Sequence, residues 1–400
     1  MKILLKLFSQ IIFVVGLITS LIIIILLIYY FNSGMYERYK PPLLLKKIND
    51  KIIYKYFGFD FYKLDKYFNQ NIKSLKYLIS DNDLETVNIN IDFNNYNNLE
   101  LQRLIKLNKD LEINSIKDFS KAKIQHNGEE YKIRLRVKGD RVLHWYKKNE
   151  TSYKIDLRNR DKIWGLEEFS IQKPITRNYI YELIFHKMLE YNNLISLKYF
   201  FINLSINNVN RGIYAVEEGF SKELLKRNKR KNGPIYGLNE KMGVIYPKIE
   251  YDLYSKNYWL KKAPDTIDIS LSNLNKVKIN ELHLNQIFDI EKWATYFAII
   301  DLTGNFHGSI TKSVKLYYNP ESKKYEPVGF DGHYNPDLFQ NFLIIDFLDN
   351  NNLNCDYICN EKSWYQKFLL LDNGKLNDEF IKLYLQKLKT ISSIKFVENF

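Results

Sequence analysis

The sequence predicts a mixed α+β fold, and the order of its apolar patterns supports this prediction. Apolar and polar residues alternate with period two, as in half-buried strands, at 86–93 (TVNINIDF), 131–137 (YKIRLRV) and 152–157 (SYKIDL). Beyond about Phe220 the pattern becomes mainly helical, and Ile290–Ile300 (IEKWATYFAII) is apolar enough for a buried helix. Strands first and helices later indicate α+β rather than alternating βαβ units.

One helix and one hairpin are predicted between these halves. Arg177–Tyr191 has apolar residues at helical spacing, namely Ile180, Leu183, Ile184 and Met188. Leu197–Leu204 and Gly212–Glu217 are strand-like and are separated by SINNVNR, in which asparagines close to a glycine favour a turn. We therefore expect a helix followed by a β-hairpin in the middle of the chain.

The N-terminal segment predicts a membrane anchor. Ile11–Phe31 is an uncharged apolar run, long enough to cross about 30 Å of hydrocarbon as one helix. A removed signal peptide is the alternative, but its apolar region is shorter and leads into small residues, whereas this run ends in two tyrosines and a phenylalanine. Lys and Arg residues flank both ends in a chain that is basic throughout, so the orientation in the membrane stays open.

The positive charge of the chain does not by itself indicate a nucleic-acid partner. The chain has 59 Lys and Arg residues against 46 Asp and Glu, a formal net charge of +13. The one dense run, Lys226–Lys231, is more typical of a solvated loop or helix end than of a binding patch, although binding of an anionic envelope polymer through it is an alternative. Cys355 and Cys359 lack a second pair of ligands for zinc.

Two patterns in the strand-rich half suit phosphate binding. Lys138-Gly139-Asp140 follows a strand, and a glycine-containing loop lets backbone N–H groups approach phosphates, although an ordinary hairpin turn has the same pattern. Lys154 on the next strand and Glu182 on the following helix have the order of the ion pair that holds a lysine against nucleotide phosphates. Exposed surface positions are the alternative for both side chains.

Residues 298–335 present four polar side chains at the ends of buried elements. Asp301 ends an apolar helix, Asn305 and His307 follow in a glycine-containing loop, and Asp331 follows an apolar strand (PVGF). Loops of this kind often hold metal ligands and catalytic bases, and carboxylate and amide oxygens suit Mg²⁺. Structural roles are the alternative here too, such as a helix cap for Asp301.

Taken in order, these motifs resemble the CotH kinase family, the spore coat protein H type of atypical kinase. The matching pieces are RLRVKGD with SYKIDL, FSIQKPITRNYIYELIFHKML, YFFINLSINNVNRGIYAVEEGFSKELL with KRKNGPI, and DLTGNFHG with LYYNPESKKYEPVGFDG. They cover roughly residues 130–335 in the family's order. The resemblance implies a two-lobed kinase-like fold that binds ATP and Mg²⁺.

The resemblance also implies roles for residues of the first lobe. Lys154 is the candidate for the lysine that binds the nucleotide, with Lys138 and Lys173 as rivals, and Glu182 is its partner on the helix. Glu217 closes the hairpin where the hinge to the second lobe is expected.

In the second lobe the chain departs from the family pattern. Asp331 matches the metal-binding aspartate, but many members have Trp-Asp-x-Asp there, and this chain has Gly332 and His333 after the first acid. Many members also have Asn-x-Asp in the preceding loop, which here reads Asn-Phe-His. His307 therefore takes the position of the usual base or second acid, with Asp301 as the alternative, and a histidine can accept a hydroxyl proton near neutral pH.

The expected organisation is an anchor at 1–31, a juxtamembrane linker and helical region at 32–85, and a CotH kinase-like domain at 86–400. Its first lobe is expected at about 86–218 and its second at about 219–400. We expect a membrane-anchored kinase that transfers the γ-phosphoryl group of ATP to a protein or cell-envelope acceptor with Mg²⁺. A catalytically inactive kinase-like module for binding or assembly at the membrane is the alternative.

Overall fold

The computed structural model describes residues 84–108, 118–139, 141–238, 251–279, 281–332, 343–348 and 362–400. The chain divides into two units at Asp83/Leu84, and every described residue belongs to the second unit. Within these ranges no helix is both long and apolar enough to span a bilayer. The predicted anchor at 11–31, both cysteines, Asp140 and His333 lie outside the described residues.

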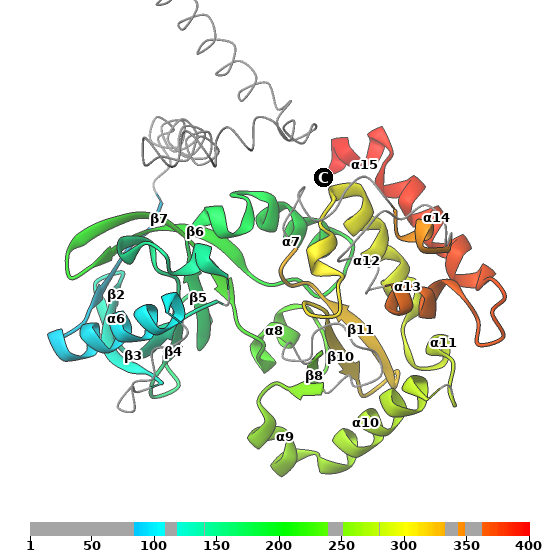
Figure 1. Ribbon diagram of the computed structural model, residues 1–400, viewed down its shortest axis with the longest axis horizontal. Coiled ribbons are helices and arrows are strands. Elements are labelled where there is room, and N and C mark those ends of the chain that lie inside the picture. Colours follow the sequence, from blue (N-terminus) through cyan, green and yellow to red (C-terminus); the bar gives the residue numbers. More distant parts are fainter. Residues whose placement is uncertain are drawn as a thin grey trace, which may run out of the picture. The chain divides into compact units, whose positions relative to one another are not determined.

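Seven strands between Thr86 and Glu218 form a closed barrel in the order β1-β2-β3-β4-β5-β7-β6 (Figure 1). Neighbouring strands are antiparallel except β1 and β6, whose parallel pairing closes the barrel. The strands are β1 (Thr86–Asn90), β2 (Ser120–His126), β3 (Glu129–Val137), β4 (Tyr153–Leu157), β5 (Glu168–Gln172), β6 (Tyr199–Ile206) and β7 (Val209–Glu218). The helix α6 (Phe93–Leu107) packs against β2 and β3.

The predicted hairpin is confirmed as β6 and β7. Its two-residue turn consists of Asn207 and Asn208, both with positive φ, which is the conformation of a type I′ turn. Asparagine tolerates this left-handed backbone better than most residues. The asparagines that predict the turn in the sequence are therefore the residues that adopt its left-handed backbone.

The predicted helix at 177–191 is shorter and buries a different face. The structure has a 3₁₀ turn, η4 (Pro174–Arg177), before the α-helix α7 (Tyr181–Tyr191). Asn178 and Tyr179 between them have φ values of 49° and 65°, which no α-helix accommodates. The buried side chains of α7 are Glu182, Phe185, His186, Met188 and Leu189.

This buried face corrects the prediction from the apolar pattern. Of the four predicted core positions of this helix, Met188 is buried, but Ile180 and Ile184 are 40% and 37% exposed. Glu182 and His186 take the inward positions because they contact each other and Glu182 also contacts a buried arginine, as described below. The paired polar side chains of Glu182 and His186 therefore occupy this part of the interior, where the pattern predicts apolar ones.

The rest of the described chain is a smaller sheet surrounded by helices. The sheet has the order β11-β10-β8-β9 and is antiparallel. Its strands are β8 (Ile235–Leu238), β9 (Tyr251–Leu253), β10 (Lys315–Asn319) and β11 (Lys324–Val328). The α-helices are α8 (Lys222–Arg227), α9 (Lys256–Lys262), α10 (Pro264–Lys278), α11 (Leu284–Ile287), α12 (Ile290–Thr303), α13 (Lys362–Leu369), α14 (Asp378–Ile391) and α15 (Ile394–Asn399).

The helix α12 is buried in this second part, as the sequence predicts. Its residues from Trp293 to Ile300 are all buried, and it packs against α14 and α7 (Figure 1). Its end is capped by Gly304, whose φ of 66° lets the chain turn into the loop that carries His307. The shorter 3₁₀ segments are η2 (Val142–His144), η3 (Lys148–Glu150), η5 (Phe306–Gly308) and η6 (Ile344–Leu348). The fold is thus α+β, as predicted.

Candidate active site

A cavity of about 330 Å³ lies where the barrel meets the second part of the chain. The barrel contributes Lys138, which directly follows β3, and Lys154 and Glu217 on β4 and β7. The second part contributes His307 in η5 and Asp331 after β11. Five predicted site residues are therefore brought together. The cavity is lined by seven basic side chains (Lys106, Arg136, Lys138, Arg141, Lys154, Arg177, Lys312) and four acidic ones (Glu168, Glu217, Glu218, Asp331). This excess of positive charge suits an anionic ligand.

Arg177 is the buried cation at the junction between the two parts. Its side chain is 4% exposed, and its guanidinium lies 2.9 Å from Oδ1 of Asp331. Its Nε lies 3.8 Å from both Glu182 and Glu217. Burial alone would lower the pKa of Arg177, but the surrounding carboxylates raise it, led by Asp331. One charged group thus joins α7, β7 and the loop after β11.

Asp331 has partners on both of its carboxylate oxygens. Oδ1 faces Arg177, while Oδ2 lies 2.7 Å from Nδ1 of His307 and accepts a hydrogen bond from Ser313 Oγ at 3.0 Å. Its φ of 58° lies in the left-handed region, a strained conformation for a residue with a side chain and one that is common at functional sites. The surrounding structure therefore holds this carboxylate in a fixed direction.

The loop around Asp331 leaves no room for larger residues. A Cβ added to Gly332 would lie 2.2 Å from the Phe185 ring, and one added to Gly308 would lie 3.2 Å from the Cα of Gly332. Gly332 therefore packs directly against α7, through the Phe185 ring.

Lys138 forms an ion pair with Glu217 inside the cavity. Gln172 donates to the other oxygen of Glu217 at 3.0 Å. Burial lowers the pKa of Lys138, and Glu217 opposes this change. Burial also acts to raise the pKa of Glu217, but Lys138 and Arg177 hold it below its usual value. The pair therefore presents a buried ammonium whose charge is only partly screened.

The predicted ion pair between Lys154 and Glu182 is not the arrangement that the structure shows. Lys154 Nζ contacts Glu168 at 2.6 Å on the neighbouring strand. Glu182 is fully buried and contacts Arg177 and Nε2 of His186, the latter at 3.2 Å. His186 accepts the Leu197 N–H at Nδ1, so its Nε2 carries the proton that faces Glu182. In the site, the cation that contacts Glu182 is therefore Arg177 and not Lys154.

The other rival lysine lies away from the cavity. Lys173 donates to the carbonyl of Arg211 at 2.6 Å, and its ammonium lies over the Tyr214 ring. Lys173 does not line the cavity, whereas Lys138 and Lys154 do. These placements favour Lys138 as the deeper of the two lysines in the cavity.

The glycine of the Lys-Gly-Asp motif makes room for a buried histidine. Gly139 has a φ of 92°, and a Cβ added there would lie 2.4 Å from the His144 ring. His144 contacts Ser152 Oγ through Nδ1 at 3.1 Å. Burial, followed by the nearby cations Arg177 and Lys138, lowers the pKa of His144 to about 2. This histidine therefore stays neutral beside the cationic cavity.

Asp301 and Asn305 do not line the cavity. The Asp301 carboxylate accepts hydrogen bonds from the Tyr384 hydroxyl and from the Ile344 N–H. Burial raises the pKa of Asp301 to about 7. Asn305 is 1% exposed, and neither polar atom of its side chain has a hydrogen-bond partner.

The donor atoms of this region are of the type that a hard divalent ion takes. Asp331 offers carboxylate oxygens, and Asn305 offers a buried amide oxygen that no hydrogen bond satisfies. A metal ion at Asp331 would have to share Oδ1 with the guanidinium of Arg177, which faces that oxygen. Within the described ranges no three His, Cys, Asp or Glu side chains are grouped closely enough to hold a metal ion.

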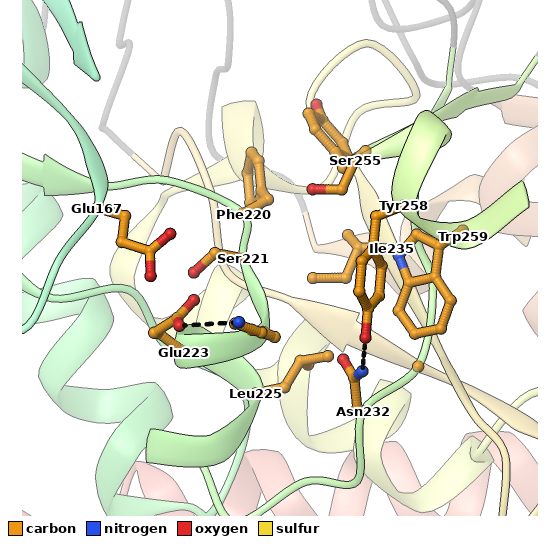
Figure 2. A pocket seen from close by; sticks show the side chains of 13 residues that line it. Glu167, Phe220, Ser221, Glu223, Leu225, Asn232, Ile235, Ser255, Tyr258 and Trp259 are labelled. Carbon is orange, nitrogen blue, oxygen red and sulfur yellow. Dashed lines mark hydrogen bonds and ion pairs between the residues drawn. The ribbon is translucent and has the colours of Figure 1, made fainter. Parts of the chain in front are cut away.

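A second cavity of about 210 Å³ adjoins the first and shares Phe220 and Tyr254 with it. In Figure 2 its two glutamates, Glu167 and Glu223, lie on one side, and Tyr258 and Trp259 on the other. The Phe220 ring lies 4.5 Å from that of Tyr254 and 5.3 Å from that of Phe330, the residue before Asp331. Aromatic rings therefore separate this cavity from the charged one.

Sequence reasoning missed the central residue of the site. Arg177 starts the predicted helix, and no pattern in the sequence marks it, Ser313 or His144 as part of a site. The motif FSIQKPITRNYIYELIFHKML includes Arg177, but local patterning does not distinguish a buried arginine from an exposed one. Its role follows from tertiary contacts with residues 5, 40 and 154 positions away, that is Glu182, Glu217 and Asp331.

A comparison with protein families matches most of the described chain. The family model described as CotH kinase protein matches residues 135–400. This range begins in β3 and includes Lys138, Arg177, Glu217 and Asp331. No curated protein matches the chain.

Proposed function

Because the chain belongs to the CotH kinase family, whose members are kinase-like, we propose that it transfers the γ-phosphoryl group of ATP to a protein or cell-envelope acceptor with Mg²⁺. One observation carries the proposal. Asp331, the residue that corresponds to the family's metal-binding aspartate, is fixed between Arg177 and His307 at the edge of a cavity rich in positive charge. Phosphoryl transfer needs mainly such positioning and charge neutralisation.

Lys138 is proposed to bind the phosphates of the nucleotide. Its ammonium is mostly buried in the cavity and is directed by Glu217, so that a phosphate oxygen arriving there meets an oriented donor. Lys154 is more exposed, at 32%, and provides a second positive charge at the edge. Glu182 acts through Arg177, which it helps to hold at the junction.

His307 is proposed as the group that accepts the acceptor's proton. Nδ1 faces the Asp331 carboxylate, which can only accept, so the proton sits on Nδ1 and Nε2 is the basic nitrogen. In the transfer the acceptor oxygen bonds to the γ-phosphorus, the bond from that phosphorus to the bridging oxygen breaks, and the hydroxyl proton passes to His307. ADP leaves with the electron pair of the broken bond.

Asp331 and Asn305 are the proposed holders of the divalent ion. When bound, Mg²⁺ supplies neutralisation of phosphate charge that the lysines alone do not provide. The buried, unsatisfied amide of Asn305 supports this assignment. Asp301 is assigned no part in the chemistry, because both oxygens of its carboxylate already accept hydrogen bonds, from Tyr384 and from Ile344.

A nucleotide-binding module that does not transfer phosphate is the second proposal. It is favoured by two observations: His307 stands where many relatives have an acid, and Arg177 already neutralises Asp331. Such a module would bind ATP through the same lysines. Residues 11–31 are proposed to anchor either form in the bilayer, on the apolar run described above.

Thermal unfolding of the full chain with and without ATP and Mg²⁺ tests the nucleotide site. A ligand at about 100 times its dissociation constant stabilises the folded state by about 2.7 kcal/mol. We expect this stabilisation in the wild type and its loss in Asp331→Ala. Asp301→Asn is the matched control, a carboxylate change outside the cavity that should leave the stabilisation intact. A folded wild type that ATP and Mg²⁺ do not stabilise would rule out both proposals.

Phosphate transfer itself separates the two proposals. Incubation with γ-labelled ATP and Mg²⁺ should label the protein or an added envelope fraction if transfer occurs. Stabilisation by ATP without label in the wild type would favour the non-transferring module.

A further inference from the structure

Three buried carboxylates surround Arg177, and their negative charges need a cation nearby. Glu182, Glu217 and Asp331 are 0%, 3% and 7% exposed, and they come from α7, β7 and the loop after β11. Their distances to the guanidinium of Arg177 are 3.8, 3.8 and 2.9 Å. Buried carboxylates that lack a positive partner are strongly destabilising, so some cation must stay with them.

A divalent metal at Asp331 would need the oxygen that Arg177 faces. Oδ2 of Asp331 already contacts His307 and accepts from Ser313, and Oδ1 lies against the guanidinium. Mg²⁺ binds carboxylate oxygens directly, at about 2.0 to 2.1 Å. An arginine and a divalent ion placed against the same oxygen repel each other strongly at such short range.

The backbone just after Arg177 is strained. Asn178 and Tyr179 both have positive φ, at 49° and 65°, and consecutive residues of this kind without glycine are uncommon. Backbone strain of this kind persists only where surrounding contacts compensate for it. This strained turn comes directly after Arg177, the residue whose side chain forms the buried ion pairs.

We propose that Arg177 occupies a divalent-cation site, so that Arg177 and a divalent metal ion compete for Asp331. Arg177 is thus a specificity-determining residue that weakens the binding of metal to the free protein. The proposal rests on the proposed function in one respect, because that function places a divalent metal at Asp331. Phosphate oxygens of a nucleotide are the natural alternative partner for a displaced guanidinium.

Titration of the full chain with Mn²⁺, followed by the loss of the free-ion electron paramagnetic resonance signal, tests the competition. Mn²⁺ is the probe because it takes oxygen ligands as Mg²⁺ does and is visible in this measurement. We expect weak binding to the wild type and at least about tenfold tighter binding to Arg177→Gln, since removal of one nearby charge is worth more than about 1.4 kcal/mol. The double variant Arg177→Gln with Asp331→Asn should lose this tighter binding.

Arg141→Gln is the matched control for charge. Arg141 also lines the cavity, and it donates to the carbonyl of Thr176 at 3.1 Å. If Mn²⁺ affinity rises in Arg141→Gln as much as in Arg177→Gln, the effect is a general one of cavity charge and the competition is overturned. Affinity that rises only in Arg177→Gln supports it.

Folding of the variant gives a second measurement. Arg177→Gln leaves three buried carboxylates together, so it should unfold at a lower temperature than the wild type, and Mn²⁺ should raise its Tm more than that of the wild type. If this variant does not fold without metal, Arg177→Lys keeps a cation with fewer donors and should also bind Mn²⁺ more tightly than the wild type.

The outcomes separate this proposal from the proposed function. Equal Mn²⁺ affinity in the wild type and in the Arg177 variants overturns the competition, even where ATP still stabilises the wild type. Absence of stabilisation by ATP and Mg²⁺ in the wild type overturns the proposed function, and that measurement involves no Arg177 variant.

Discussion

Asp331 and Asp301 are carboxylates that both end a buried element, but they lie in opposite environments. Asp331, after β11, lies between an arginine and a histidine and lines a cationic cavity. Asp301, near the end of α12, accepts hydrogen bonds from Tyr384 and Ile344. The first environment stabilises a negative charge, whereas burial in the second raises the pKa of the carboxyl to about 7.

The difference shows that position at the end of a buried element does not decide function. A carboxylate that must hold a metal or orient a base needs nearby cations or donors that keep it charged. A carboxyl with only a hydroxyl and an amide as partners is stable in its protonated form and serves packing. The predictions below test this contrast, from the largest expected effect to the smallest.

The largest effect is expected at His307, the histidine that Asp331 orients. His307→Gln removes the proposed base while keeping a polar side chain of similar size, and loss of a general base costs about 10² to 10⁴ in rate. We expect a decrease of this order in kcat for phosphate transfer, measured with γ-labelled ATP, with little change in the affinity for ATP. Asp301→Asn is the control and should keep its rate. A normal rate in His307→Gln together with a slow Asp301→Asn would reverse the assignment.

An intermediate effect is expected at the two lysines of the cavity. Lys138 is 16% exposed and pairs with Glu217, whereas Lys154 is 32% exposed and pairs with Glu168, itself 42% exposed. Because a buried charge is screened less by water, Lys138→Met should weaken ATP binding by about tenfold or more, and Lys154→Met by only about twofold to threefold. Isothermal titration calorimetry of both variants provides the comparison. Stronger loss in Lys154→Met would return the role of nucleotide lysine to Lys154.

Much of the fold could be predicted because it depends on local patterns. The hairpin β6–β7 follows from alternating residues and an asparagine turn, and α12 follows from a largely apolar run. The helix α7 was the exception. Its inward face carries Glu182 and His186, and these polar residues are buried because Arg177 and Leu197 provide partners for them.

The site was predictable in its members more than in its pairing. Lys138, Lys154, Glu217, His307 and Asp331 were predicted for the site and line one cavity. Asp301, Asn305 and Glu182 were also predicted and do not line it. The predicted pairing of Lys154 with Glu182 was wrong. In the strand register Asp156 lies opposite Glu168, and Lys154, two residues before Asp156, has its side chain within reach of Glu168. Long-range ion pairs depend on register and docking, which no local pattern in the sequence encodes.

The smallest effect is expected in the pH dependence of stability that Asp301 causes. Its pKa is about 7 in the folded protein, against a usual value of 3.8, so between these values the folded state binds more protons than the unfolded state. Stability from this group is therefore full below about pH 4 and is lost as the pH rises through about 7. Asp301 is only partly buried, so we expect a loss on the order of 1 kcal/mol.

Asp301→Asn should remove this dependence, because an amide does not titrate and can still accept from Tyr384 and Ile344. Urea unfolding of the wild type and the variant at pH 5 and pH 8 measures it: the variant should gain relative to the wild type on going to pH 8. Asp252→Asn, at an exposed carboxyl of β9, is the control and should show no such change. If the unfolding free energies of the wild type and of Asp301→Asn change by the same amount between pH 5 and pH 8, the carboxyl of Asp301 is charged in the folded protein at both pH values. Both carboxylates would then carry a negative charge. The two would differ only in that Arg177 and His307 neutralise the charge of Asp331.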